Sequence, residues 1–296
     1  MTLRFCVLGS GSSGNSSYLE ADGYGVLLDL GLGARRLAKG LATANAKWDR
    51  VRAAVLTHTH GDHWTRSTFR QLLKSRIPLY CHREQAATLR RQSRLFTALD
   101  QAALVRTYDA LRPLQLGPLQ WLPFEVPHDD EPTCGFRIEG PAGALGYATD
   151  LGTWSERVAR HLCDVDILAV EFNHDVKLQR SSGRPRMLIE RALSDRGHLS
   201  NEQAARLLAH VLRNTEPGRL RHVVLLHLSQ QCNHPRLAHA AAAAALGRHE
   251  RRIEIHVARH HAPSAVLTTG RQAGSRYRPE SLVPMRQAML PGWEGD

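Results

Sequence analysis

The sequence Thr57-His58-Thr59-His60-Gly61-Asp62-His63 places four potential metal ligands within six consecutive positions. It directly follows the apolar run at residues 52–56, which is typical of a buried strand. Residues two apart on an extended chain point the same way, so His58 and His60 can bind one metal ion together. A single histidine at such a place is usually structural, but three histidines and an aspartate at this spacing favour a metal site.

The last three positions of this motif predict a second ion close to the first. If the chain turns at Gly61, Asp62 and His63 are carried past the first ion and can bind another one a few ångströms away. Imidazole and carboxylate ligands together suit zinc, manganese or iron. The motif therefore predicts a hydrolytic site with two divalent metal ions.

Three later apolar runs each end on a possible ligand: His128 after residues 119–127, Asp150 after 143–149, and His227 after 223–226. Strand ends are where sheet proteins place their chemistry. Taken singly, these residues also fit a turn histidine, a turn former and a polar core residue. Their order favours a shared site, if the strand ends lie along one sheet edge. The expected assignment is His58, His60 and His128 for one ion, Asp62, His63 and His227 for the other, and Asp150 as the bridge.

These motifs, in this order, resemble those of the metallo-β-lactamase-fold hydrolases. The five ordered motifs are Asp29 after residues 26–28, the histidine cluster at 58–63, His128, Asp150 and His227. The resemblance covers roughly residues 1–270 and implies an α/β fold, a four-layer αββα sandwich, in a single hydrolase domain. Residues 271–296 are rich in Gly, Pro and Arg, and we expect a C-terminal extension that is mobile or lies across the surface.

Within that family, residues 9–16, 171–175, 197–201 and 226–229 resemble the bacterial exonuclease-like branch. Glu171, His198 and His227 are also arranged much as in the related transfer-RNA 3′-processing ribonuclease Z. The resemblance implies that His198 is the general acid and that Glu171 contacts His198 on the side away from the substrate. Asp29 is expected to hydrogen-bond the histidine loop from outside the ligand set. Phe172 departs from the pattern, because many relatives carry a smaller residue there, and this difference bears on the shape of the pocket wall.

The glycine-rich segment at residues 9–14 also matches a dinucleotide-binding fingerprint, with Asp29 about 20 residues beyond its first glycine. A dinucleotide-binding turn must lead into a helix, however, whereas Asp22-Gly23 indicates a hairpin between two strands. The loop amides can still receive an anion, and substrate contacts are expected at Ser12, at Asn15 and, farther along, at Asn201. The alternative is that the loop is only a flexible turn between strands and binds no ligand.

Composition favours a single domain and an anionic partner. The chain has 296 residues with 42% hydrophobic content, enough for one large core, and Lys+Arg 39 against Asp+Glu 28 gives a net charge of +11. An arginine bias can also reflect genome composition. Residues 176–196 hold six basic and two acidic side chains just before His198, so they are expected to guide a nucleic-acid backbone into the site. The alternative is an exposed loop that is charged for solubility.

The lack of a recognisable export signal and the pattern of cysteines predict a cytoplasmic protein. The five cysteines are odd in number and scattered, without a Cys-x-x-Cys pair, and are expected to be reduced thiols. The apolar opening at residues 3–8 is too short for an export signal, and no apolar run approaches the roughly 20 residues that cross a bilayer. No membrane partner is therefore expected. The oligomeric state stays open, a homo-oligomer included.

The secondary structure expected from periodicity is an alternation of strands and helices. Strands are expected at residues 26–29, 52–56, 77–81, 165–170 and 253–257, with consecutive antiparallel strands from 119 to 148. Helices are expected at residues 34–44, 66–76, 84–95, 155–162, 201–212 and 235–246.

The predicted function is that of a dinuclear metal-dependent hydrolase, most simply a phosphodiesterase or 5′-3′ exonuclease-like nuclease. Two ions lower the pKa of a bridging water and orient the resulting hydroxide for attack on phosphorus. Asp62 would hold or deprotonate that water, and His198 would protonate the departing oxygen. One alternative is a thioester or lactone hydrolase of the glyoxalase II kind, and another is a metal-stabilised nucleic-acid-binding protein without turnover. The acid His198 and the arginines beside it favour a phosphate diester.

Overall fold

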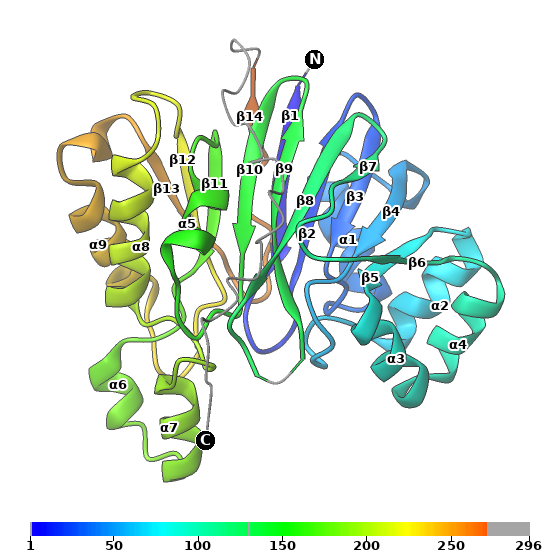
Figure 1. The fold of residues 1–296 in the computed structure, drawn as a ribbon, viewed down its shortest axis with the longest axis horizontal. Coiled ribbons are helices and arrows are strands. Elements are labelled where there is room, and N and C mark those ends of the chain that lie inside the picture. The colour runs from blue at the N-terminus through cyan, green and yellow to red at the C-terminus, as the bar shows by residue number, and fades with distance from the viewer. Residues whose placement is uncertain (1, 130, 271–296) are drawn as a thin grey trace, which may run out of the picture.

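A computed structural model describes residues 2–129 and 131–270, and the strands of these residues form two seven-stranded sheets (Figure 1). The first sheet has the order β14-β1-β2-β3-β4-β5-β6 and the second has the order β13-β12-β11-β10-β9-β8-β7. The strands of the first sheet are β1 (Leu3–Gly9), β2 (Ser16–Ala21), β3 (Tyr24–Leu28), β4 (Val51–Val55), β5 (Leu79–His82), β6 (Val105–Tyr108) and β14 (Leu267–Thr269). Those of the second are β7 (Leu114–Leu116), β8 (Leu119–Val126), β9 (Thr133–Gly140), β10 (Gly143–Ala148), β11 (Ile167–Glu171), β12 (His222–Leu226) and β13 (Glu254–Val257).

Both sheets change from antiparallel to parallel pairing partway across. In the first sheet β1, β2 and β3 pair antiparallel, whereas β3 to β6 pair parallel. In the second sheet β7 to β10 pair antiparallel, whereas β10 to β13 pair parallel. Parallel neighbours end at the same sheet edge, so the loops after them lie close together.

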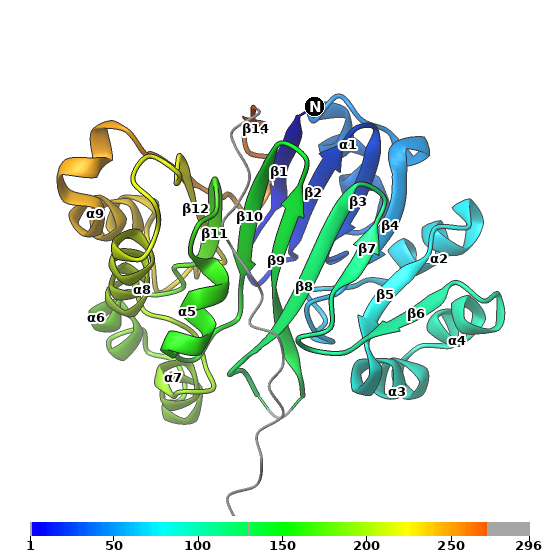
Figure 2. The ribbon, with the colours of Figure 1, turned by 45° about the horizontal axis from the view of Figure 1, so that its top comes forward.

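Helices cover the outer face of each sheet (Figure 2). The first sheet is covered by α1 (Ala34–Thr43), α2 (Arg66–Ser75), α3 (Arg83–Gln92) and α4 (Arg94–Gln101), and the second by α5 (Glu156–Leu162), α8 (Asn201–Arg213) and α9 (Pro235–Leu246). Two short helices, α6 (Val176–Arg180) and α7 (Arg186–Leu193), lie together beyond the ends of the strands of the second sheet. The 3₁₀ turns are η1 (Trp48–Arg50) and η2 (Gly247–Arg251).

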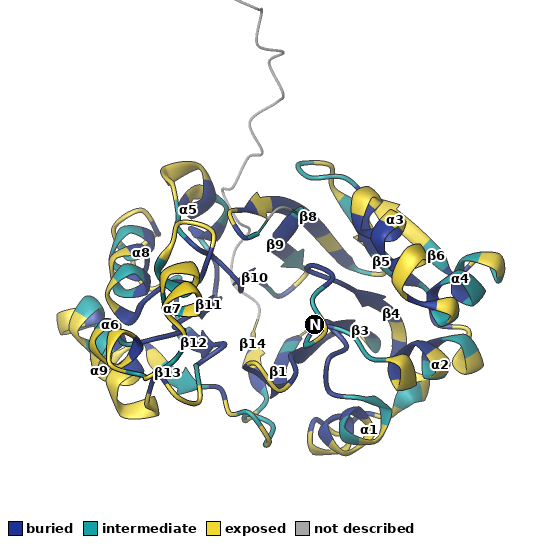
Figure 3. Ribbon diagram, turned by 90° about the horizontal axis from the view of Figure 1, so that it is seen from below, coloured by how far each residue is buried: buried dark blue, intermediate teal, exposed yellow. Residues whose placement is uncertain are grey.

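Alternation along the strands builds three separate apolar layers. Phe5 and Val7 of β1 pack between the two sheets, whereas Cys6 and Leu8 pack under the helices of the first sheet. Strand β12 repeats the pattern, and its residues 223 and 225 face the helices of the second sheet. Strands that bury both faces carry apolar residues at almost every position. Figure 3 shows the strands buried and the outer sides of the helices exposed, and the predicted αββα sandwich is confirmed.

The local differences from the sequence-based expectations have clear causes. The helix expected at residues 84–95 is two helices, because Ser93 ends α3 and its hydroxyl accepts a hydrogen bond from the Phe96 amide, 3.3 Å away, to cap α4. The glycine-rich loop after β1 leads into the hairpin β2–β3, as Asp22-Gly23 indicates, and not into a helix. The extension expected at residues 271–296 lies outside the described residues. Among the described residues, no helix is both long and apolar enough to cross a bilayer.

Candidate metal centre

The residues predicted as ligands converge where strands end. Asp29 follows β3, the histidine loop follows β4, Asp150 lies just after β10, and His227 follows β12. Asp29, Asp150 and His227 have positive φ angles of 61°, 57° and 56°, so the chain leaves each of these strands through a left-handed residue. This conformation is uncommon for residues other than glycine, and here it occurs at three positions that contribute side chains to one site.

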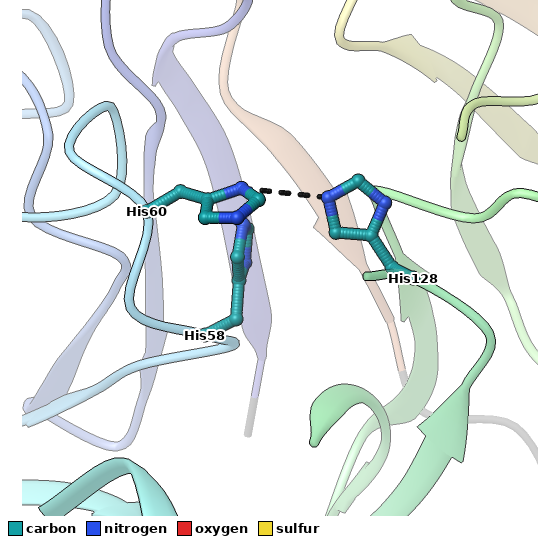
Figure 4. A group of neighbouring side chains, drawn as sticks. All are labelled: His58, His60 and His128. Carbon is teal, nitrogen blue, oxygen red and sulfur yellow. Dashed lines mark hydrogen bonds between the residues drawn. The ribbon is translucent and has the colours of Figure 1, made fainter. Parts of the chain in front are cut away.

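His58, His60 and His128 form the first group of donors (Figure 4). Nδ1 of His60 lies 3.4 Å from Nε2 of His128, and the rings of His58 and His60 have centroids 4.5 Å apart. His58 is buried, and its Nε2 has no hydrogen-bond partner among the described residues. A buried nitrogen without a partner is costly unless a bound ion uses its lone pair.

Asp62, His63 and His227 form the second group. Oδ2 of Asp62 lies 3.6 Å from Nε2 of His63 and 3.4 Å from Nε2 of His227. The chain turns before this group, because the His63 amide donates to the His60 carbonyl at 2.9 Å. The turn does not need a glycine, since Gly61 is not among the residues with positive φ and a side chain there would meet open space.

Asp150 lies between the two groups. Its Oδ2 is 3.3 Å from Nε2 of His63, and its Oδ1 is 3.9 Å from Nε2 of His128. With His58 and His63 it also forms a buried donor group of its own. One carboxylate can therefore reach both groups, which is the arrangement that a bridging ligand requires.

Each candidate histidine ligand has its second ring nitrogen next to another polar group. The pairs are His58 Nδ1 with Thr57 Oγ1 (3.0 Å), His60 Nε2 with Asp129 Oδ2 (2.8 Å), His63 Nδ1 with Asp29 Oδ2 (2.9 Å), His128 Nδ1 with the Gly197 carbonyl (2.8 Å) and His227 Nδ1 with Glu171 Oε1 (2.9 Å). Such outer partners hold the tautomer and orientation of histidines that bind metals. The remaining nitrogens face the centre, so the site suits divalent metal ions.

The protonation states of the buried groups follow from burial and from neighbouring charge. Burial lowers the pKa of His58 well below its usual value, and the nearby His63 lowers it further. Burial raises the pKa of Asp150, but the charges of His227 and His63 outweigh this effect and hold the pKa well below its usual value. Burial lowers the pKa of His63, but Asp29 and Asp150 outweigh it, and the net pKa is raised. The carboxylates thus draw in positive charge, which bound cations can supply in place of protons.

His198 and Glu171 form a pair beside the second group. Nδ1 of His198 lies 2.9 Å from Oε1 of Glu171, while the other carboxylate oxygen accepts hydrogen bonds from the amides of Leu151 at 2.8 Å and Leu199 at 3.1 Å. Burial raises the pKa of Glu171, but the charge and hydrogen bond of His198 outweigh it and the pKa falls to about 2. Glu171 is therefore an ionised acceptor that orients His198.

A cavity of about 290 Å³ opens onto His198 and His227. Arg184, Leu188 and Arg191 line it from the segment that carries α7. Arg191 also forms an ion pair with Asp129, the carboxylate next to His60. The basic segment predicted from the sequence thus reaches the site, although it folds as two helices and not as the charged loop considered as its alternative.

A second cavity of about 530 Å³ lies on the His58 and His60 side of the centre. Trp64, Asp129 and Glu131 are among the residues that line it. The metal centre is therefore open on two sides. The side that holds His198 is basic, whereas the other presents carboxylates.

The residues predicted to contact substrate have different surroundings. Ser12 is exposed and lines the cavity beside His198. Asn15 is buried, and its amide nitrogen lies 3.0 Å from both Asp62 Oδ2 and His63 Nε2. Asn201 is buried too, and its side chain exchanges hydrogen bonds of 2.9 Å with Asn233. The described residues that line the cavity include neither Asn15 nor Asn201.

Phe172, whose departure from the family pattern bears on the pocket wall, does not itself line the cavity. Its side chain is fully buried in the apolar layer between the second sheet and its helices. Strand alternation explains this position, because Glu171 before it points toward the centre. The cavity wall is formed by the next residue, Asn173.

Sequence reasoning missed three groups that hold the candidate ligands in place. Thr57 Oγ1 lies within 3.2 Å of Asp29, His58 and His63. Asp129 directly follows His128, and this adjacency was a usable signal for a second carboxylate. The Gly197 carbonyl gives no signal in the sequence, because any residue type presents the same acceptor.

Comparisons with known proteins place the chain in a family. Residues 24–228 match the family model described as "Beta-lactamase superfamily domain". Exodeoxyribonuclease WalJ of Streptococcus pneumoniae is 31% identical over 236 residues, which are 80% of this chain and 85% of that protein. Exodeoxyribonuclease YycJ of Bacillus anthracis is 28% identical over 248 residues, which are 83% of this chain and 90% of that protein.

A solved structure supports the same fold. The metallo-beta-lactamase fold protein YhfI from Bacillus subtilis superposes with a TM-score of 0.65, at 15% identity, over 89% of this chain and 99% of that one. This chain therefore belongs to the beta-lactamase superfamily, as an exonuclease-like member with the metallo-β-lactamase fold.

Proposed function

We propose that this protein is a metal-dependent exodeoxyribonuclease that hydrolyses phosphodiester bonds with two divalent ions. One observation carries the proposal: Asp150 lies between two donor groups, and the second group adjoins the His198–Glu171 pair at a basic cavity. The names of the WalJ and YycJ relatives support DNA as the substrate class. Nitrogen and oxygen donors suit zinc, manganese and iron alike.

The residues divide the work of the reaction. When bound, the ions activate water at neutral pH and offset the negative charge that develops on the phosphate. Asp62 is placed to bind the second ion and to orient the attacking water. His198 faces the cavity and donates a proton to the departing oxygen, while Glu171 holds its ring in position. Arg184 and Arg191 contact phosphates of the bound strand.

The surroundings of the cavity favour this substrate over an acyl compound. Thioester and lactone hydrolysis would use the same ions, but it has no need for two arginines beside the general acid. A protein that only binds nucleic acid would have no use for a proton donor oriented by a buried carboxylate. Five buried cysteines free of disulfides fit the cytoplasm as its location. Assembly into a homo-oligomer stays a prediction.

A substrate panel tests the proposal. The protein is loaded with zinc or manganese and incubated with DNA labelled at the 5′ or the 3′ end, with RNA of the same sequence, with bis-p-nitrophenyl phosphate and with a lactoyl thioester. We expect mononucleotides released progressively from one end of the DNA, and none from a His198→Ala preparation purified in parallel. Activity confined to the thioester would contradict the proposal, and internal cleavage of DNA would contradict its exonuclease part.

A further inference from the structure

A second cluster of potential metal ligands lies at the far end of β12 from the centre. His222 begins this strand, whereas His227 follows its last residue. At about 3.3 Å per residue, the two positions are roughly 16 Å apart along the strand. The cluster consists of His222, Glu254 and His256, and it shares no residue with the groups described above.

The strand register brings these three side chains to one face. His222 pairs with Glu254 across the parallel strands β12 and β13, and His256 lies two residues beyond Glu254. Residues two apart on a strand share a face. Val224, which follows His222 on that face, packs between the sheets, so the cluster lies where the space between the two sheets reaches the outer edge of the second one.

The donor atoms have the spacing of a tetrahedral site. Nδ1 of His222 is 3.2 Å from Nε2 of His256, and Oε2 of Glu254 is 3.6 Å and 3.5 Å from these two nitrogens. Zinc bonds of 2.0–2.1 Å in a tetrahedron place neighbouring ligands about 3.3 Å apart. The three distances surround that value, and three protein ligands leave one position for water.

A hydrogen bond between the two rings accounts for only part of this geometry. It would use the 3.2 Å separation of the nitrogens, but it would not explain a carboxylate oxygen nearly equidistant from both.

We propose that His222, Glu254 and His256 bind one first-row divalent ion, zinc above all, and that this ion fastens β13 to β12. Within the described residues β13 is the outermost strand of its sheet and pairs with β12 alone. Edge strands are exposed to fraying and to pairing with other chains. An ion held jointly by the two strands would restrain that edge, separately from the chemistry of the metal centre.

Zinc content tests this site without relying on activity. The untagged full chain is stripped with a chelator, reloaded with a slight excess of zinc and desalted, and bound zinc is then measured per chain. His256→Gln and Glu254→Gln are compared with His239→Gln and Glu250→Gln, which remove exposed residues of the same types on α9 and η2. We expect each site variant to hold about one ion per chain less than wild type, and each control variant to hold as much as wild type.

Folding and activity separate this site from the metal centre. The side chain of Glu254 is 71% exposed, so its replacement should leave the circular dichroism spectrum unchanged. Both site variants should hydrolyse bis-p-nitrophenyl phosphate at the wild-type rate. Zinc should raise their Tm less than it raises the Tm of wild type, because only the metal centre still binds the ion. Equal zinc content in wild type, His256→Gln and Glu254→Gln would overturn the proposal. A matching loss in the control variants would overturn it as well.

Discussion

Oε1 of Glu171 lies 2.9 Å from Nδ1 of His198, and the same oxygen lies 2.9 Å from Nδ1 of His227. One buried carboxylate oxygen thus positions both the proposed general acid and a proposed metal ligand. It leaves Nε2 of His227 facing Asp62, 3.4 Å away. The acid and the second ion are therefore held at a fixed separation, as protonation of a leaving group requires.

Replacement of His198 by alanine should remove turnover and leave the metals. His198 lies 2.9 Å from Glu171 and 3.6 Å from Asp150, and its ring lies beside those of His128 and His227, but it belongs to neither of the two proposed donor groups, so most of the bound metal should remain. Loss of a general acid typically lowers kcat about 10²- to 10⁴-fold. Metal content and kcat with end-labelled DNA, whose departing sugar oxygen needs a proton, are measured on the same preparation, with the exposed His239→Ala as control. Loss of metal in proportion to activity would make His198 a ligand.

Replacement of Glu171 by glutamine should affect both stability and activity. The carboxylate accepts from two rings on one oxygen and from two amides on the other, whereas glutamine has a single acceptor oxygen. One pair of donors is then left without an acceptor, at a cost of about 1–3 kcal/mol. We also expect metal affinity to fall about 10- to 100-fold, which is typical when a residue that hydrogen-bonds to a metal ligand is replaced. Urea unfolding and metal titration measure the two effects.

The matched control for that variant is Glu125→Gln, which changes an exposed glutamate on β8. It should leave unfolding, metal affinity and turnover as in wild type. A Glu171→Gln protein with wild-type stability and activity would show that the orientation of His198 does not depend on this carboxylate.

The clustering of the proposed ligands could be predicted from the sequence because each ligand, or the motif that contains it, follows an apolar run. His58, Asp150 and His227 are marked by local patterns, and the order of the motifs supplied the rest. The backbone conformation that brings them together could not be predicted in this way. Asp29, Asp150 and His227 are themselves in the left-handed conformation, and the periodicity of apolar residues gives no sign of it. The strands were predictable for the same reason, since apolar runs mark them, whereas the packing of the two sheets face to face was predicted from the resemblance.

The helices α6 and α7 were missed because they lack an apolar face that packs on the core. None of the residues of α7 is buried, and Met187 is 73% exposed. Helical periodicity is detectable only where one side of a helix is apolar and packed. The role of Asn15 was equally hidden, because its partners Asp62 and His63 lie 47 and 48 residues away. Contacts between such distant side chains leave no trace in a single sequence.

Replacement of Arg184 by glutamine should weaken DNA binding with little effect on chemistry. Arg184 lines the cavity, whereas Arg191 is engaged by Asp129, so the change at Arg184 is the cleaner one. Each lost phosphate contact lowers the salt dependence of binding by about one unit of slope. We expect a higher KM for DNA, a shallower slope of log KM against log salt, and an unchanged kcat. Arg248→Gln, on exposed η2, is the control and should match wild type.

Removal of the metals should destabilise the fold. Asp29, Asp150 and Glu171 are carboxylates with almost no exposed surface, and bound cations offset their mutual repulsion. When the free metal concentration is 100 times the Kd of a site, binding adds about 2.7 kcal/mol to the free energy of unfolding. Thermal unfolding in a chelator should therefore give a lower Tm, and added zinc or manganese should restore it. An unchanged Tm, with metal content shown to be zero, would contradict the proposed centre.

His161, which lies outside the metal centre, should make the free energy of unfolding depend on pH. Its ring stacks on Phe124, with centroids 4.9 Å apart and planes at 12°, and burial, helped by the charge of Arg137, lowers its pKa to about 4. An unfolded histidine has a pKa of about 6.5, so between these values the unfolded chain binds the proton more readily. The stabilising contribution of neutral His161 is thus complete above pH 6.5 and is lost as the pH falls toward 4.

The variant His161→Phe isolates this effect, because it keeps a ring against Phe124 and removes the titration. The full shift corresponds to about 3 kcal/mol, but the ring is partly exposed, so screening by solvent reduces the expected contribution to about 1–2 kcal/mol. Urea unfolding of both proteins between pH 7 and pH 4 measures it. Since every other titrating group is common to the two proteins, wild type should lose that much more stability than the variant over this range. Parallel curves would show that His161 is protonated as readily in the folded as in the unfolded chain, and that its burial does not oppose the charge.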